Sequence, residues 1–202
     1  MCNLYRMTRA VDEIAGLFNA AAQVGNAGAE IYPGYPGYVA EGGRLRQMSW
    51  GFPLAMRGKH GQILKPRPVN NARADKLQGG FWKSSFTDRR CLIPVTAWAE
   101  AEGENGKKTR SWLSLPDSSV FSIGGIWRSS AEWGDVYSMV MTDAAPQVSA
   151  VHHRMPVIVA PEDRDVWLTS PADQAFELCR PWQGHIAIDR TTEPWVKRKA
   201  AG

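Results

Sequence analysis

The sequence predicts an α+β fold: a single compact domain, residues 1–202, in which a curled, barrel-like and mainly antiparallel sheet is flanked by helices. Three observations lead to this prediction. A chain of 202 residues with 44% hydrophobic residues and nine tryptophans can bury one sizeable core. Short β-branched and aromatic segments alternate with turn residues, which is typical of a sheet that curls. Helical patterns lie near the two ends, and neither a repeat nor a linker divides the chain.

A helix is predicted first, from about Arg9 to Val24. Thr8 has the side chain of an N-cap, acidic residues follow in the early turns, and Gly25 ends the pattern. One face of this helix carries the apolar residues Val11, Ile14, Leu17 and Phe18.

The middle of the chain is predicted to be mostly strands. The Gly/Pro-rich stretch from Tyr32 to Gly43 is predicted to be a loop, and Leu45–Trp50 a strand. Five more β-branched or aromatic segments are bounded by turn residues: Cys91–Trp98, Ser111–Leu115, Val120–Trp127, Val136–Thr142 and Pro156–Ala160.

Two helices are predicted near the C-terminus. The first begins with Pro161 in its first turn, where the missing N–H costs nothing. The second is predicted to be capped by Ser170, with Pro171 following and Asp173 completing a pattern like a capping box.

The cysteines and the apolar runs bear on the compartment. Cys2, Cys91 and Cys179 are an odd number at unrelated spacings, and the N-terminus lacks the regions of a signal peptide. We therefore expect a reducing cytoplasm. No apolar run approaches the 18 or so residues that span a bilayer, so no membrane function is expected.

Positive charge is concentrated in one segment. The net charge is +4, yet Arg57 to Arg90 holds nine Lys/Arg against Asp75 and Asp88, a local balance of +7. Such a segment suits a phosphate backbone, and the alternative is a solvated basic face. Its aromatic neighbours either stack on bases of single-stranded nucleic acid or pack in the core: Trp50, Phe52, Phe81, Trp82 and Phe86.

Cys2 directly follows Met1, so removal of one residue would give an N-terminal cysteine. Its α-amine, with a reference pKa of about 8, and its thiol, at about 8.5, are both partly available near neutral pH. Such a 1,2-aminothiol suits aldehydes, because the amine forms a Schiff base and the thiol then closes a thiazolidine. The alternative is an inert cysteine at a position where small residues are common.

Five motifs together carry a family resemblance. They are Met1-Cys2, Trp50-Gly51-Phe52-Pro53, Asn71-Ala72-Arg73-Ala74-Asp75, Arg89-Arg90-Cys91-Leu92-Ile93-Pro94 leading to Trp98-Ala99-Glu100, and His152-His153-Arg154-Met155-Pro156. In order and spacing they resemble the SOS response-associated peptidase (SRAP) family, the abasic-site processing proteins. The resemblance implies an SRAP-like fold, removal of Met1 as self-processing, and a covalent thiazolidine between the N-terminal cysteine and the ring-opened sugar of an abasic site in single-stranded DNA.

The resemblance implies four reactive residues: Cys2, Asn71, Glu100 and His152. Desolvation at a strand end could raise the pKa of Glu100 and let it shuttle protons, although taken alone it fits a solvated charge. His152 can exchange protons with the sugar as it opens, and His153 is the alternative. No zinc-ligand spacing occurs, so no metal and no cofactor are expected.

The resemblance assigns Arg73 to DNA. Asn71 also fits an N-cap of a short helix over Ala72–Gln78, ended by Gly79. Arg89 and Arg90 could extend the basic track, with a structural ion pair as the alternative for one of them. The predicted DNA-binding set is Arg73, Trp50, Arg89, Arg90 and Arg154.

Three departures affect the expected DNA geometry: Asn3-Leu4 stands where familiar members carry Gly-Arg, Asp75 replaces a glutamate, and Ala101 a tryptophan. The expected partner is single-stranded DNA with abasic sites, bound by a monomer. Two alternatives remain: a thiol peptidase that uses Cys2 with His152 and Asn71, and a non-catalytic single-stranded DNA-binding module.

Overall fold

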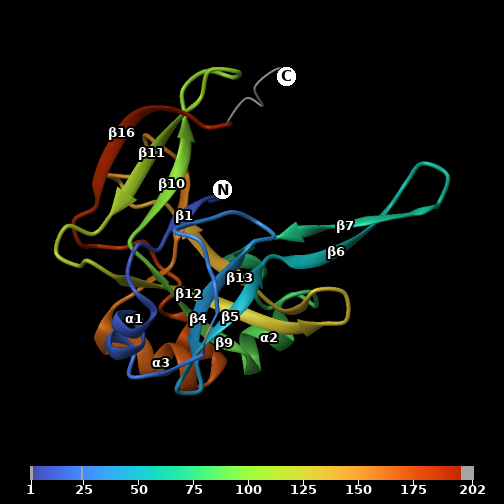
Figure 1. Cartoon of the computed structure of the whole chain (residues 1–202), viewed down its shortest axis with the longest axis horizontal. Helices are drawn as coiled ribbons and strands as arrows, with labels where there is room; N and C mark the ends of the chain where they lie inside the picture. The colour runs from blue at the N-terminus through green and yellow to red at the C-terminus, as the bar shows by residue number, and fades with distance from the viewer. Residues whose placement is uncertain (1, 24, 197–202) are drawn as a thin grey trace.

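The computed structural model describes residues 2–23 and 25–196, and a closed barrel of five strands lies at its centre (Figure 1). Neighbouring strands pair in the order β13, β12, β9, β4 and β5, and β5 pairs back onto β13. The strands are β4 (Pro36–Glu41), β5 (Arg44–Trp50), β9 (Arg90–Val95), β12 (Phe121–Ser130) and β13 (Gly134–Asp143). Only the closing β13–β5 pair is parallel. The predicted curled, mainly antiparallel sheet is therefore confirmed.

Short strands extend the barrel at its rim. They are β2 (Ala21–Ala22), β8 (Asn71–Arg73), β14 (Arg154–Pro156) and β15 (Ile158–Val159). β8 pairs with β13 over Met139–Met141, and β14 pairs with β13 over Met141–Asp143. The Asn-Ala-Arg and His-His-Arg motifs therefore meet at one end of β13, although about eighty residues separate them in the chain.

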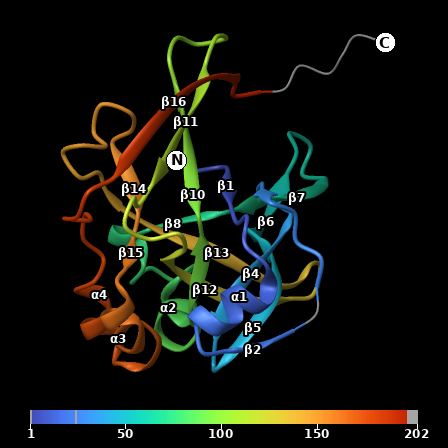
Figure 2. The ribbon, with the colours of Figure 1, turned by 60° about the vertical axis from the view of Figure 1, so that its left-hand side comes forward.

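A second sheet of five strands stands beside the barrel, in the order β16-β11-β10-β1-β3. Its strands are β1 (Tyr5–Arg6), β3 (Glu30–Ile31), β10 (Ala97–Glu102), β11 (Thr109–Ser114) and β16 (Ala187–Pro194). The single strand predicted over Cys91–Trp98 is wrong, because the chain passes from β9 to β10 at Thr96 and so changes sheet. There the Thr96 N–H donates to Arg6 O at 2.8 Å. This crossing places β10 beside the start of the chain (Figure 2).

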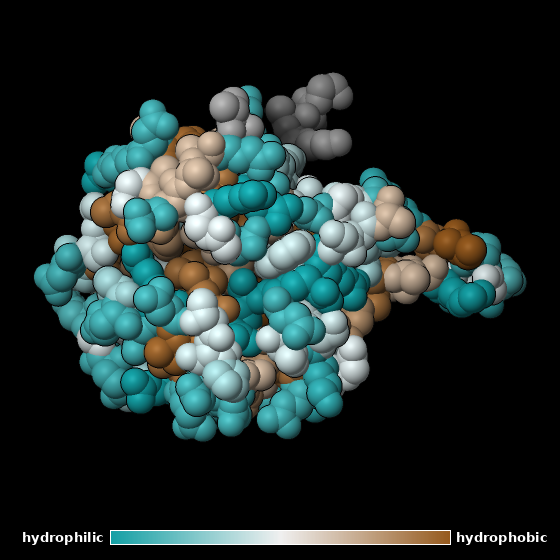
Figure 3. Space-filling view, turned by 90° about the horizontal axis from the view of Figure 1, so that it is seen from below, coloured by the Kyte–Doolittle hydropathy of each residue, from teal (hydrophilic) through white to brown (hydrophobic). Residues whose placement is uncertain are grey.

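A two-stranded hairpin, β6 (Phe52–Arg57) and β7 (Ile63–Val69), projects away from the barrel (Figures 1 and 2). It begins directly after Gly51, whose φ is +121° and where a side chain would collide with Pro68. Only glycine suits that turn. In Figure 3 the hairpin is an arm with apolar surface near its outer end, where Ile63 is 82% exposed.

Figure 1 shows the helices α1 (Val11–Leu17), α2 (Lys83–Asp88) and α3 (Arg164–Thr169) at the lower part of the barrel. The other short helices are η1 (Ala74–Lys76), η2 (Pro161–Asp163) and α4 (Ala172–Phe176). The predicted caps Thr8 and Ser170 are wrong, since Ala10 and Pro171 hold those positions. The first helix is also shorter than predicted. It stops because Asn19 adopts a positive φ of 46° and the chain turns into β2 against β5. Val24 lies outside the described residues.

The loop predicted over residues 32–43 is also wrong, because it contains β4. Val39 and Ala40 are buried in the barrel, so packing outweighs the weak strand propensity of the glycines and prolines around them. Gly37 is required, because a Cβ there would collide with the hydroxyls of Tyr5 and Tyr137. Within the described ranges, no helix has the length and apolar character needed to cross a membrane.

Candidate active site

Cys2 lies where the start of the chain meets β10. β1 pairs antiparallel with β10, Tyr5 facing Trp98, and the Ala99 N–H donates to Leu4 O at 2.9 Å. This register brings the residues before β1 alongside Glu100. The Cys2 side chain is fully buried, and its thiol donates to Leu4 O at 3.4 Å.

Two neighbouring amides hold the backbone of Cys2. The Nδ2 atoms of Asn70 and Asn71 both donate to Cys2 O, at 2.8 Å and 2.7 Å. Asn71 lies in strand β8 and not at a helix start, so the predicted N-cap is wrong. Its Oδ1 is buried without a hydrogen-bond partner among the described residues, which leaves an acceptor near Cys2. Sequence reasoning missed Asn70, although the tandem Asn-Asn was visible.

Burial changes the acid–base properties of Cys2 and Glu100. Glu100 is 1% exposed, and burial raises its pKa to about 7. Burial, with the nearby charge of Glu100, raises the pKa of the Cys2 thiol well above its ordinary value. The thiol is therefore neutral at physiological pH, while the carboxyl beside it can both give and take a proton. A thiol peptidase needs the opposite shift at its cysteine.

His152 is held by the backbone just before β14. Its Nδ1 accepts from the Arg154 N–H at 3.0 Å, and its ring stacks on His153 with centroids 4.3 Å apart. Burial lowers the pKa of His152, and the charges of His153 and Arg154 act in the same direction. His152 precedes β14, which pairs with the same end of β13 as β8, the strand that carries Asn71.

Arg73 and Arg154 reach the same cavity, of about 350 Å³, at the end of β13. They come from β8 and β14, the strands on either side of that end. Arg73 forms a two-point contact with Asp75, at 2.6 Å and 2.8 Å. Asp75 has a lowered pKa, chiefly because of the hydrogen bond from Arg73, and the charge of Arg154 contributes. The two arginines therefore line a cavity that begins two residues from Asn71, and the carboxylates of Asp75 and Asp143 lie in the same wall.

The SOS response associated peptidase (SRAP) family model matches residues 1–193. This chain belongs to the SRAP family. Among curated proteins it is similar to the abasic site processing protein YoqW of Bacillus subtilis, with 27% identity over 69% of this chain and 65% of YoqW. It is also similar to YobE of the same organism, again abasic site processing, with 27% identity over 62% of this chain and 58% of YobE. The chain thus matches less than two thirds of either relative's length.

Solved structures agree on the fold. A protein from Bacteroides thetaiotaomicron has a TM-score of 0.79 at 19% identity, covering 94% of this chain and 91% of that one. A protein from Bordetella bronchiseptica has the same TM-score at 21% identity, covering 94% and 99%. The predicted SRAP-like fold is therefore confirmed.

Two residues predicted to bind DNA are placed elsewhere in this SRAP fold. Trp50 is fully buried, with its Nε1 donating to Asn70 O at 3.0 Å, so its ring cannot stack on a base. Arg90 is buried, and its guanidinium donates to backbone carbonyls of Phe86, Thr87, Trp167 and Ser170. Arg90 therefore joins α2 to α3 and is not part of a basic track.

The other residues predicted to bind DNA, and the aromatic residues near them, are partly buried and partly exposed. Arg89 is half-buried beside α2 and donates to Ser84 Oγ at 2.7 Å. Phe52, Trp82 and Phe86 are buried, as the core alternative predicts, whereas Phe81 is 39% exposed with its edge against Trp82. Within the described part of the chain, no three His, Cys, Asp or Glu side chains gather as a metal site.

Proposed function

We propose that this protein binds single-stranded DNA at abasic sites and joins it covalently to Cys2, once Met1 has been removed, through a thiazolidine ring. One observation carries the proposal: a cysteine at position 2 lies beside a buried glutamic acid with a pKa of about 7, and two amides fix its backbone. The SRAP match and the names of the curated relatives support abasic DNA as the substrate.

The first step is hydrolysis of the Met1–Cys2 peptide bond, which consumes one water and frees the Cys2 amine. Glu100 is the general base for this water. Asn70 and Asn71 donate to Cys2 O, so they keep the new terminus in place as the bond breaks. This step is the self-processing activity that we propose.

The second step joins the amine to the sugar. Neutral His152 takes the proton of the C1′ hydroxyl and returns one to the ring oxygen, which opens the sugar to its aldehyde. The lowered pKa of His152 keeps it in the form that can accept that proton. The amine then adds to the aldehyde carbon, and loss of one water gives the imine.

The third step closes the ring. The Cys2 sulfur adds to the imine carbon as Glu100 takes the thiol proton, and a proton goes to the nitrogen. No atom is lost, so the whole capture from aldehyde to thiazolidine releases one water. Because the Cys2 pKa is raised, the thiol does not compete with the amine for the first addition. Burial thus sets the order of the two additions.

Non-covalent capture uses cationic side chains that face solvent. The β6–β7 hairpin carries Arg57, Lys59, Lys65 and Arg67 with no acidic residue between Phe52 and Val69. Arg73 and Arg154 add the cavity beside β13. We propose single strands as the preferred form, because the sugar must reach a buried cysteine and a stacked, paired duplex would prevent this.

The test is a denaturing gel of protein incubated with abasic single-stranded DNA. We expect a heat-stable adduct from the parent and none from Cys2→Ala. Cys2→Ser keeps the amine, so it should give an imine that borohydride traps. Cys179→Ala is the control and should react normally, because Cys179 supplies a thiol without an amine. An undiminished adduct from Cys2→Ala would refute the proposal, and DNA binding without any adduct would leave a non-catalytic binding module.

A further inference from the structure

A cavity of about 600 Å³ opens beside the first residues of the chain. Its walls include Asn3, Leu4, Tyr32, Tyr35, Arg110 and Trp195. Its size is in the range of small-molecule sites. The steps proposed above do not use it.

The wall of this cavity begins at the residue that follows Cys2. Asn3 and Leu4, the next two residues, form part of its wall. Asn70 Nδ2 donates both to Cys2 O and to Asn3 Oδ1, at 2.8 Å and 3.0 Å. One amide therefore contacts the backbone of the nucleophile and the rim of the cavity.

The charges in this cavity are already paired. Arg110 is buried, and its guanidinium lies 3.3 Å from Glu30 and 3.3 Å from Glu193, with Tyr32 OH at 3.2 Å. Glu30 also binds Arg6 at 2.8 Å, so two carboxylates balance two guanidiniums and no net positive charge remains to attract a phosphate. The cavity therefore suits an uncharged group.

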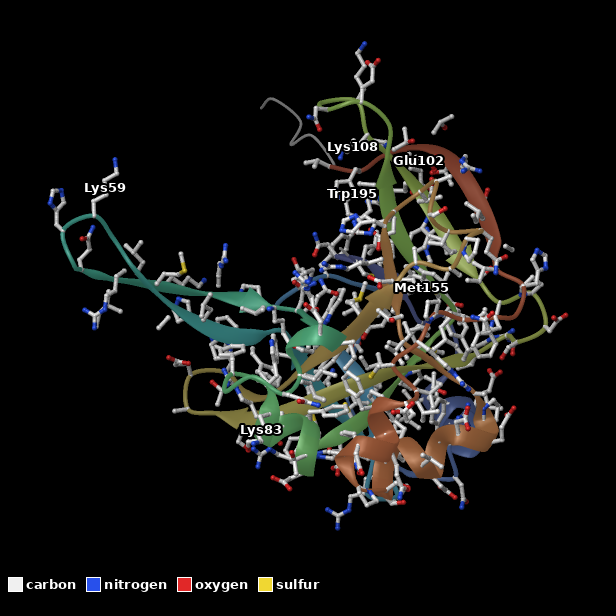
Figure 4. All side chains as sticks on the ribbon, turned by 180° about the vertical axis from the view of Figure 1, so that it is seen from behind. Lys59, Lys83, Glu102, Lys108, Met155 and Trp195 are labelled. Carbon is white, nitrogen blue, oxygen red and sulfur yellow. The ribbon has the colours of Figure 1, made fainter. Side chains whose placement is uncertain are left out.

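The walls are flat and aromatic. The Tyr35 side chain is 60% exposed, with its ring 6.0 Å from that of Tyr32 in an edge-on arrangement. Trp195 lies past the end of β16, where its backbone N–H donates to Lys108 O at 2.8 Å (Figure 4). Exposed aromatic faces beside apolar wall residues are the surfaces on which nucleobases stack.

We infer that this cavity receives the nucleobase next to the abasic nucleotide, stacked on Tyr35. The inference rests on the proposed function, because it takes single-stranded DNA as the ligand and the abasic sugar at Cys2 as its fixed point. The lesion has no base of its own, so its neighbour is the closest ring that the strand can offer. The phosphates then lie toward Arg73 and Arg154, and the base lies toward Tyr35.

The test is binding of single-stranded DNA that contains a tetrahydrofuran abasic analogue, which cannot open to an aldehyde. Fluorescent 2-aminopurine is placed on its 5′ side in one oligonucleotide and on its 3′ side in another. We expect quenching on one of the two sides with the parent and with Tyr35→Phe. Tyr35→Ala should lose that quenching and bind about tenfold more weakly, the loss of one base–aromatic stack.

The outcomes separate the two proposals. If the parent binds and forms adducts but neither position is quenched, or Tyr35→Ala matches Tyr35→Phe, the base site is refuted and the proposed function stands. If Tyr35→Ala weakens binding equally when both neighbours of the lesion also lack bases, Tyr35 contacts the backbone and the inference is wrong. If the parent binds no abasic single-stranded DNA, both proposals fail.

Discussion

The Cys2 site and the β6–β7 hairpin treat ionisable groups in opposite ways. At Cys2 the thiol and the Glu100 carboxyl are withdrawn from water, and burial raises the pKa of both. On the hairpin the basic side chains form no ion pair with any described residue, and Arg57, Lys59, Lys65 and Arg67 are exposed. In the proposed function the buried groups carry out the covalent reaction and the exposed groups bind DNA. Mutations at the buried groups should therefore change the reaction rate, and mutations on the hairpin should change the affinity for DNA.

The largest effect is expected at Glu100, on the rate of adduct formation. Glu100→Gln keeps the shape of the side chain and removes its proton transfer, so single-turnover adduct formation should slow by about 10² to 10⁴-fold. The parent rate should rise with pH through about 7, as Glu100 ionises, and then level off. The variant should lose that step. Salt-dependent DNA binding should not change, because Glu100 does not face solvent.

Stability provides the control for that variant. The folded protein raises the pKa of Glu100 above its ordinary value of 4.5, so folding favours the protonated acid. The parent therefore loses stability as pH rises from about 4.5 to about 7, and Glu100→Gln does not. Urea unfolding should show the variant more stable at pH 8, with the difference fading below pH 5 or so. A slow variant that is also less stable at pH 8 would indicate misfolding.

A smaller effect is expected on the β6–β7 hairpin, in the salt dependence of DNA binding. Lys59 lies at the tip of the hairpin and Lys83 on the barrel body (Figure 4). Lys59→Ala should lower the log–log salt slope of single-stranded DNA binding by roughly 0.7, the value for one lost phosphate contact. Further changes at Arg57, Lys65 and Arg67 should each add a similar decrease, and Lys83→Ala should add none. Equal slopes for Lys59→Ala and Lys83→Ala in anisotropy titrations would show that the hairpin does not contact DNA.

The barrel could be predicted because the residue composition of each strand is typical of a buried strand. Leu92, Ile93 and Val95 are buried on a strand flanked by polar residues, and β12 and β13 show the same apolar pattern. Such segments need no knowledge of their partners to be recognised. The resemblance to SRAP proteins added the order of the motifs, which composition could not supply.

The predictions that proved wrong concern residues whose structure depends on contacts with residues far away in the sequence. Asn71 fits a helix cap locally, yet β8 pairs with β13, about seventy residues further along the chain. Arg90 looks like part of a basic track, yet four carbonyls on α2 and near the end of α3 enclose its guanidinium. Trp50 looks like a stacking ring, yet the closing β13–β5 pair buries it. None of these contacts has a local sequence signal.

The hairpin was missed for a different reason. Pro53 on β6 faces Pro68 on β7, and Pro66 also lies on β7. Proline argues against a strand in a wide sheet, but a two-stranded hairpin has only edges, where proline is tolerated. The glycine at position 61, with its φ of +78°, marks the turn and was the available signal.

Intact-mass and peptide mass spectrometry of the adduct would identify the covalent bond at Cys2 most directly. We predict a protein that lacks Met1, joined to DNA with loss of one water, and a modified peptide that begins at Cys2. Borohydride should leave this mass unchanged, because a thiazolidine has no imine to reduce. An adduct that retains Met1, or one that maps to a lysine of the β6–β7 hairpin, would contradict the account.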